Sequence, residues 1–260
     1  MQTQLINGIS LAYERRGHGT PLLLVHGFPL DHSCWDALVP ELEERADLIL
    51  PDLRGMGRSG SGTVGAPEGA YSLADLAADL AGLLDALKIE KVVVAGHSMG
   101  GYVALAFARA YPQRLAGLGL ISTQALPDTP ERKAGRYASA DQVAAQGVVV
   151  VADAMAPKLT ANPGQVPAIR ELILRQPAAG VIGSLKAMAE RPDSTDLLPG
   201  LKVPVAIVCG QADALIPADR SREMKALIPQ AVLSELPAVG HSPMLEAPVE
   251  TARALAYLLR

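Results

Sequence analysis

The chain has 260 residues, of which 49% are hydrophobic, and a formal net charge of −4. This length suits one domain with a large core, and the scattered basic residues exclude an extended nucleic-acid surface. No apolar run is long enough to span a membrane. The two cysteines, Cys34 and Cys209, lie far apart without the neighbours of a metal site, and residues 1–4 lack the character of a secretory signal. We therefore expect a cytoplasmic protein without nucleic-acid, membrane or metal partners.

The first third of the chain predicts β-strands that begin with a hairpin. Residues 4–6 and 9–13 flank Asn7-Gly8, a dipeptide typical of two-residue hairpin turns. Continuous apolar runs follow at residues 22–25 and 48–50. Such runs are typical of strands that are buried on both faces of a parallel sheet.

Helices are expected between these strands and after them. The first has an apolar face formed by Trp35, Leu38 and Leu42. Glycine and serine mark residues 59–69 as a surface loop. Ser72 then caps a helix over 73–87, which carries leucines along one face.

The centre of the chain combines a strand, a sharp turn and a helix. Residues 92–95 predict a buried strand, and residues 102–111 predict a buried helix. Another strand follows at 118–121, and the later strands lie at 203–208 and 232–236. From the strand at 22–25 onward, helices alternate with the strands, a pattern that predicts an α/β fold with a mostly parallel, doubly wound sheet of eight strands.

A long alanine-rich stretch interrupts this alternation. It is too long for a simple connection, and its helical segments lie near 131–137, 140–155, 166–175 and 178–189. We interpret residues 125–200 as an inserted helical cap. The core would then comprise residues 1–124 and 201–260, with helices over 220–227 and from Pro248 to 259 in its second part.

Ser98 is the candidate nucleophile. It is the serine of Gly96-His97-Ser98-Met99-Gly100, a Gly-x-Ser-x-Gly pattern that lies between the predicted strand and the predicted helix. A chain that turns this sharply strains the serine backbone and presents its hydroxyl at the carboxyl end of the sheet. A serine that merely caps the helix would not need glycine on both sides.

A serine hydroxyl needs a base, and that base needs an orienting acid. Asp213 follows the strand at 203–208, and His241 follows the last strand. Carboxyl ends of parallel strands gather reacting groups, so we expect His241 to act as the base and Asp213 as the acid. Asp219, or the pair Asp193 and Asp196, remain alternative carboxylates.

The remaining histidines fit the role of base less well. We expect His97 to point away from the nucleophile and His26 to hold an early loop in place, with His18 and His32 in surface turns. A tetrahedral intermediate also needs two donors for its oxyanion. The backbone N–H groups of Met99 and Phe28 are the candidates, since both follow strand ends.

These motifs together resemble the α/β-hydrolase superfamily over the whole chain, and the end of the cap looks like that of small bacterial carboxylesterases. The motifs stand in the order His26-Gly27-Phe28-Pro29, Asp52-Leu53-Arg54-Gly55-Met56-Gly57-Arg58-Ser59, Gly96-His97-Ser98-Met99-Gly100, Gly210-Gln211-Ala212-Asp213 and Gly240-His241. The resemblance implies a serine esterase that works through an acyl-enzyme without a cofactor. We expect an Asp52–Arg54 pair and Glu246 to be structural.

Other members of this superfamily define the alternatives. Haloalkane dehalogenases and epoxide hydrolases carry aspartate where this chain has Ser98. Perhydrolases and cofactor-free haloperoxidases resemble it at Pro29, which follows Phe28. Enol-lactonases need clustered arginines for a carboxylate substrate, a feature left open by Arg132, Arg136, Arg170, Arg175 and Arg191, which are spread along the sequence. A ligand-binding receptor of the same fold is the non-enzyme alternative.

The substrate is expected to be a small neutral ester with a short to medium acyl chain. This expectation depends on an apolar cleft beside Ser98. The candidate lining residues are Phe28, Pro29, Trp35, Met155 and Met188. Most apolar side chains of the cap would instead pack it onto the core.

Overall fold

The computed structural model describes residues 1–61 and 71–259, so the loop expected at 59–69 lies mainly outside the described residues. Within them, eight strands form one sheet in the order β1-β2-β4-β3-β5-β6-β7-β8. They are β1 (Gln2–Ile6), β2 (Ile9–Gly17), β3 (Thr20–Val25), β4 (Ala46–Pro51), β5 (Val92–His97), β6 (Leu115–Ile121), β7 (Val205–Gly210) and β8 (Val232–Leu236). Strand β2 is antiparallel to both neighbours, and the remaining pairs are parallel. The predicted α/β fold with a mostly parallel sheet is confirmed.

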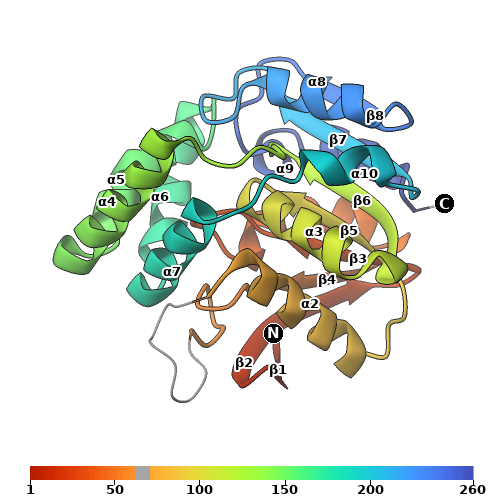
Figure 1. The fold of residues 1–260 in the computed structure, drawn as a ribbon, viewed down its shortest axis with the longest axis horizontal. Coiled ribbons are helices and arrows are strands. Elements are labelled where there is room, and N and C mark those ends of the chain that lie inside the picture. The colour runs from red at the N-terminus through yellow and green to blue at the C-terminus, as the bar shows by residue number, and fades with distance from the viewer. Residues whose placement is uncertain (62–70, 260) are drawn as a thin grey trace.

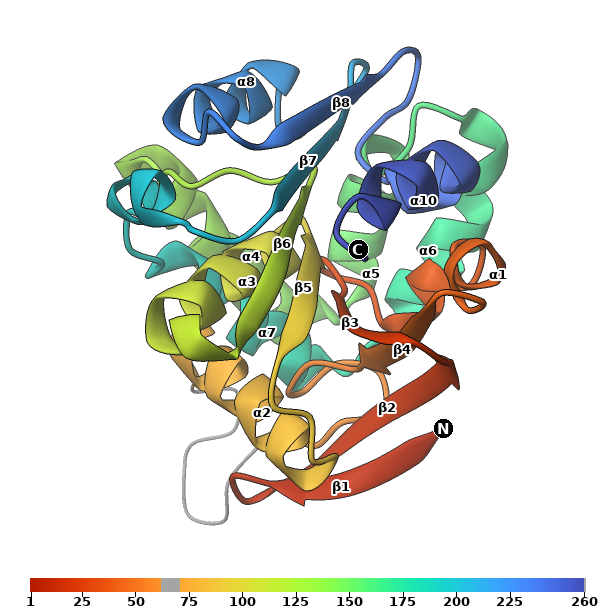
Figure 2. The ribbon, with the colours of Figure 1, turned by 90° about the vertical axis from the view of Figure 1, so that its right-hand side faces the viewer.

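Helices cover both faces of the sheet (Figure 2). Helices α2, α3 and α8 lie on one face, and α1 and α10 lie on the other. The ten described α-helices are α1 (Val39–Leu42), α2 (Leu73–Ala86), α3 (Met99–Ala110), α4 (Pro130–Gln146), α5 (Val149–Met155), α6 (Val166–Leu174), α7 (Ala178–Ala189), α8 (Ala218–Leu227), α9 (Pro243–Glu246) and α10 (Pro248–Ala256). None of these helices has the length and apolar character that crossing a bilayer requires.

The hairpin and the first long helix form as the sequence predicts. Asn7 and Gly8 have φ of 48° and 79°, the left-handed conformation that a type I′ turn requires at both central residues. Ser72 and Asp75 make a reciprocal capping box at the start of α2, which satisfies two backbone N–H groups that have no acceptor within the helix. Local sequence therefore determines these two elements.

Two predicted helices are divided in the structure. The expected helix through Trp35 and Leu42 consists of a 3₁₀ turn over His32–Trp35 and the short α1, because Pro40 cannot donate within a continuous helix and suits a first turn. The helix expected over 140–155 breaks at Gly147, where φ is 83°. A glycine in this conformation ends a helix, so α4 stops at Gln146 and α5 begins at Val149.

Helices α4 to α7 lie between β6 and β7 in the chain and gather on one side of the molecule (Figure 1). Helices α4 and α7 pack side by side. Gly180 in α7 packs directly against the backbone of the loop after β4. A β-carbon on Gly180 would lie only 1.7 Å from the Gly55 carbonyl oxygen. The helical segment is thus seated on the loops that follow the strands.

Candidate active site

The backbone turns sharply at Ser98, between β5 and α3. Ser98 has φ of 52° and ψ of −113°, a conformation that costs free energy for a residue with a side chain. Its N–H donates to the Ile121 carbonyl at 2.8 Å, and its carbonyl accepts from the Thr123 hydroxyl at 2.8 Å. The partly exposed serine is therefore held in the strand–turn–helix context that its motif predicts.

The glycines on either side of Ser98 are required by close backbone contacts. A β-carbon on Gly96 would lie 2.1 Å from the Gly100 carbonyl oxygen, and one on Gly100 would lie 2.1 Å from the Val25 carbonyl oxygen. Real β-carbons do not approach backbone atoms this closely. The turn can therefore close over β3 only when both positions lack a side chain.

We expect Gly100→Ala to lower the free energy of unfolding by about 3 kcal/mol, because the backbone of β3 must shift to admit the methyl group. Gly135→Ala is the matched control. Gly135 lies within α4, and a β-carbon there would meet nothing within 4 Å, so alanine should raise stability by about 0.5–1 kcal/mol. Urea titration of both variants measures the difference. Equal stability of the two variants would contradict the steric explanation.

His241 and Asp213 form a buried pair. The Nδ1–H of His241 donates to Asp213 Oδ2 at 2.7 Å, and both side chains are at most 1% exposed. The other carboxylate oxygen of Asp213 accepts from the backbone N–H groups of Leu215 and Ile216 at 2.8 and 3.0 Å. These bonds fix the carboxylate, which in turn leaves Nε2 of His241 as the nitrogen that can accept a proton.

The alternative carboxylates make other contacts. Asp219 pairs with Arg222 at 2.7 Å, and Asp196 pairs with Arg109 at 2.6 Å, both on the surface. Asp193 accepts from the backbone N–H of Thr195. The structure therefore brings Asp213, and none of these three, into contact with His241.

His97 supports the loop that carries His241. Its Nε2–H donates to the His241 carbonyl at 2.8 Å, and the two ring centroids are 5.0 Å apart. Burial, together with the neighbouring His241, holds the pKa of His97 well below its ordinary value. His97 is thus a neutral, fully buried ring. Its bond to the His241 backbone agrees with the expectation that it does not serve as the base.

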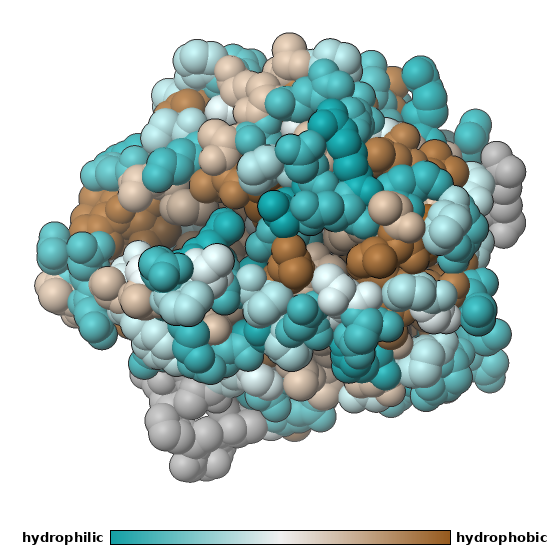
Figure 3. All heavy atoms as spheres, turned by 45° about the horizontal axis from the view of Figure 1, so that its top comes forward, coloured by the Kyte–Doolittle hydropathy of each residue, from teal (hydrophilic) through white to brown (hydrophobic). Residues whose placement is uncertain are grey.

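Ser98 and His241 line one cavity of about 370 Å³. Helices α4, α5 and α7 contribute further lining residues, and hydrophobic side chains gather on this side of the molecule (Figure 3). Of the predicted substrate-binding residues, Phe28, Met155 and Met188 line the cavity.

The prediction for Trp35 is not supported by its position. Trp35 is fully buried, and its ring lies edge-on to His97 at 6.4 Å between centroids. Neither Trp35 nor Pro29 is among the cavity-lining residues, and both are buried. Trp35 is therefore a core residue. Its aromatic character alone could not show whether it lies in the core or in the cavity wall.

Sequence reasoning missed the charge of this cavity. Arg132, Arg136 and Lys158 line it, whereas the sequence predicted an uncharged cleft. Arg132 and Arg136 lie one turn apart on α4, so helical spacing could have placed them on one face. That this face borders the cavity follows only from how α4 packs.

A family model described as the alpha/beta hydrolase fold matches residues 20–248. The chain belongs to the α/β-hydrolase family. The fold and the turn at Ser98 agree with this membership.

Similar proteins include solved enzymes of this family. A thermophilic esterase from Thermogutta terrifontis, solved with malate bound, is 42% identical, covers 100% of this chain and 98% of its own, and superposes with a TM-score of 0.94. An enol-lactonase from Burkholderia xenovorans LB400 is 26% identical, with 99% of both chains covered and a TM-score of 0.90.

A longer protein is also similar to this α/β-hydrolase. The dihydrolipoyllysine-residue acetyltransferase component of the acetoin cleaving system of Pseudomonas putida is 32% identical over 257 residues, which are 93% of this chain. The chain spans 64% of the length of that protein and 34% of the length of similar Mycobacterium tuberculosis proteins.

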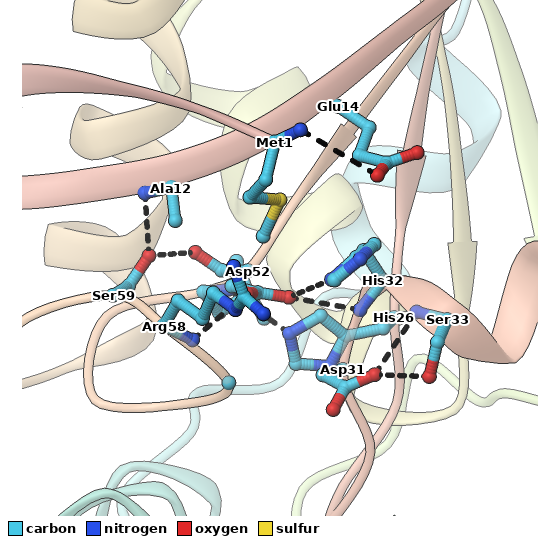
Figure 4. A network of polar contacts seen from close by, with 12 residues as sticks. Met1, Ala12, Glu14, His26, Asp31, His32, Ser33, Asp52, Arg58 and Ser59 are labelled. Carbon is cyan, nitrogen blue, oxygen red and sulfur yellow. Dashed lines mark hydrogen bonds and ion pairs between the residues drawn. The ribbon is translucent and has the colours of Figure 1, made fainter.

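The loop after β4 is held differently from the prediction (Figure 4). Arg54 pairs with Asp79 of α2 at 2.7 Å, so the expected Asp52–Arg54 pair is wrong. Asp52 instead accepts from Nδ1 of His32 at 2.6 Å and from the Arg58 N–H at 2.9 Å. Both carboxylates are buried, and each needs its own donors there.

His26 connects the loop after β4 to the end of β3, and so holds its own early loop in place as predicted. Its Nε2 accepts from the Leu53 N–H at 2.9 Å, so its Nδ1 carries the hydrogen and donates to the Gly27 carbonyl at 2.9 Å. Burial lowers the pKa of His26 despite the nearby Asp52, which keeps the ring neutral. The ring therefore positions the segment that carries Phe28.

Asp31, His32 and Asp52 place one ligand-type atom each within 4.8 Å of one another, the one such group of three among the described residues. Their atoms are already engaged within the protein. Asp31 accepts from Ser33 and from the Gln176 amide at 2.8 Å, and Asp52 holds His32. We therefore interpret the group as structural.

His32 lies in this ion pair, with its side chain only 18% exposed, rather than in the expected surface turn. Burial alone would lower the pKa of His32, but the hydrogen bond and charge of Asp52 outweigh it and raise that pKa. A raised folded-state pKa stabilises the protein below the unfolded value of about 6.5, and this stabilisation is lost as pH rises through the folded value.

We therefore expect His32→Gln to cost about 0.5–1 kcal/mol of unfolding free energy at pH 6, and less at pH 9. Urea titration at both pH values gives the difference. His18→Gln, at an exposed position, is the control and should change stability little at either pH. A cost of His32→Gln that does not fall with rising pH would exclude the ion pair as its source.

Glu246 connects the His241 loop to the helical segment. Its carboxylate accepts from the Gly240 N–H at 3.1 Å and from the Ala161 N–H at 2.9 Å. The expected structural role of Glu246 agrees with these bonds. It holds the backbone beside His241 while bridging to the chain between α5 and α6.

Proposed function

We propose that this α/β-hydrolase is a serine carboxylesterase that hydrolyses carboxylic esters through an acyl-enzyme. The observation that carries the proposal is the buried Asp213–His241 pair, whose histidine lines the same cavity as the strained Ser98. This combination supplies a nucleophile, a base and an orienting acid. The similarity to a thermophilic esterase supports the same reaction class.

In the acylation step, Nε2 of His241 takes the proton of the Ser98 hydroxyl while Oγ attacks the ester carbonyl carbon. The tetrahedral intermediate collapses, the ester C–O bond breaks, and His241 returns the proton to the departing alcohol. Water then attacks the acyl-serine, with His241 again as the base, and releases the acid. Asp213 stabilises the imidazolium formed in both steps.

The oxyanion of each intermediate requires backbone donors. We propose the N–H groups of Met99 and Phe28. Met99 begins α3, where backbone N–H groups have no acceptor within the helix. Phe28 is 4% exposed and lines the cavity from the loop after β3.

We further propose that residues 125–200 form a cap that sets the size of the substrate. Met155 of α5 and Met188 of α7 support this role, since both border the cavity that contains Ser98. We also place the enzyme in the cytoplasm, an assignment supported by the free, buried thiols of Cys34 and Cys209.

A chain-length series of p-nitrophenyl esters tests the proposed activity. The cavity of about 370 Å³ is at the small end of ligand sites, so acetyl and butyryl esters should give a higher kcat/KM than palmitoyl esters. Exclusive turnover of long acyl chains would contradict the proposal. Binding of these esters without turnover would instead indicate a receptor.

A further inference from the structure

The charged side chains that line the cavity are basic. Among the described residues that line it, Arg132 and Arg136 of α4 and Lys158 after α5 are charged, and none is acidic. A partly enclosed cavity with charges of one sign concentrates ligands of the opposite sign. Their attraction for an anionic ligand depends on how far the protein's own carboxylates neutralise them.

One carboxylate contacts three guanidinium groups, two of which belong to cavity-lining arginines. The Asp128 side chain is fully buried and contacts Arg136, Arg191 at 2.8 Å and Arg132 at 3.6 Å. Burial alone would raise the pKa of Asp128, but Arg136 and Arg191 outweigh it and lower that pKa. Asp128 is therefore ionised and supplies one negative charge against three positive ones.

The surplus of positive charge lies toward the cavity. Arg191 is 2% exposed and stacks over the Tyr102 ring at 4.2 Å, with its guanidinium bound to Asp128. Arg132 is 41% exposed, lies 3.6 Å from Asp128 and donates one N–H to the Leu215 carbonyl at 3.4 Å. Its guanidinium has five N–H groups, so it retains donors for a ligand. Lys158 has no ion-pair partner within residues 1–61 and 71–259.

We propose that the natural ester carries a second, ionised carboxylate, which Arg132 and Lys158 bind while Ser98 attacks the ester carbonyl. This inference rests on the proposed esterase function and revises the neutral ester expected from the sequence. Arginine offers a forked donor pair that matches a carboxylate, and lysine adds a point charge. Arg136 is bound to Asp128 and mainly holds α4 in position.

Matched esters that differ by one charge test the proposal. Mono-p-nitrophenyl adipate is compared with its neutral methyl ester, and 4-acetoxybenzoate with its methyl ester, so that the carboxylate lies on the acyl or on the alcohol side. A charged hydrogen bond is worth about 1.5–3 kcal/mol, so kcat/KM for the anionic ester of at least one pair should be roughly tenfold or more higher. This preference should shrink at high salt.

Two variants and a control assign the effect to the cavity. Arg132→Gln and Lys158→Gln should each lower the anionic-to-neutral ratio of kcat/KM roughly tenfold. Lys133→Gln should leave the ratio unchanged, because Lys133 lies beside Arg132 but pairs with Glu190 at 2.7 Å on the surface. Equal ratios in the wild type and all three variants would overturn the proposal.

The esterase proposal and this inference fail in different ways. Turnover of the neutral esters that is lost in Ser98→Ala, without any preference for the anionic esters, would sustain the esterase and refute the carboxylate site. Should no ester turn over, calorimetry on the Ser98→Ala protein compares binding of each anionic ester with its neutral partner. Tighter binding of the anionic ester that Lys158→Gln weakens would support the site, and equal binding would refute it.

Discussion

Replacing Ser98 with alanine is expected to lower kcat for p-nitrophenyl butyrate by about 10⁶-fold. The reason is chemical, since alanine has no atom that can form the acyl-enzyme, and the remaining oxyanion donors give only a small rate over water. Steady-state kinetics at saturating ester measures the loss. The turn itself should persist, because Ser98 is held through its backbone N–H and carbonyl.

Ser122→Ala is the matched control. Ser122 is buried, has a positive φ of 45° like Ser98, and directly follows the neighbouring strand β6. It has no part in the proposed chemistry, so its loss should change kcat less than twofold. A Ser98→Ala enzyme with more than a few per cent of wild-type activity would assign the nucleophile to another residue.

Asp213→Asn is expected to lower kcat by about 10⁴-fold. The buried carboxylate accepts from His241 Nδ1 and from two backbone N–H groups. An asparagine that keeps its carbonyl oxygen on the backbone donors presents its NH₂ to His241, which favours the tautomer with hydrogen on Nε2. That ring cannot take the serine proton, and its imidazolium loses a compensating charge.

The same assay on Asp219→Asn provides the comparison. Asp219 is exposed and pairs with Arg222, so its substitution should change kcat less than twofold. The two variants carry the same chemical change at carboxylates six residues apart. A large loss in Asp219→Asn together with wild-type rates in Asp213→Asn would transfer the role of acid to Asp219.

Local signals predicted the parts of the fold that local chemistry determines. The left-handed turn at Asn7-Gly8 and the capping box at Ser72 depend on neighbours within a few residues. Asp213 was predicted because parallel strands deliver their carboxyl ends to one edge of the sheet. The break at Gly147 carried a local signal as well, and it was overlooked within an alanine-rich run.

Contacts between distant segments could not be predicted in the same way. Arg54 pairs with Asp79 and not with Asp52, although Asp52 is nearer in the sequence. Helix α2 places the Asp79 carboxylate against the loop, whereas Asp52 pairs with His32. Trp35 was placed in the pocket although it packs against His97. The cationic lining depends on how α4 lies over Asp128. Each of these outcomes is set by tertiary packing and not by residue type or spacing.

Covalent labelling with a fluorophosphonate tests most directly the claim that Ser98 is the nucleophile. The phosphorus of this reagent reacts with an activated nucleophile beside oxyanion donors. Peptide mapping by mass spectrometry locates the adduct. We predict one adduct, on Ser98, that Asp213→Asn slows strongly and Asp219→Asn does not. An adduct on another residue, or an unlabelled Ser98 in an enzyme that still hydrolyses esters, would contradict the proposed mechanism.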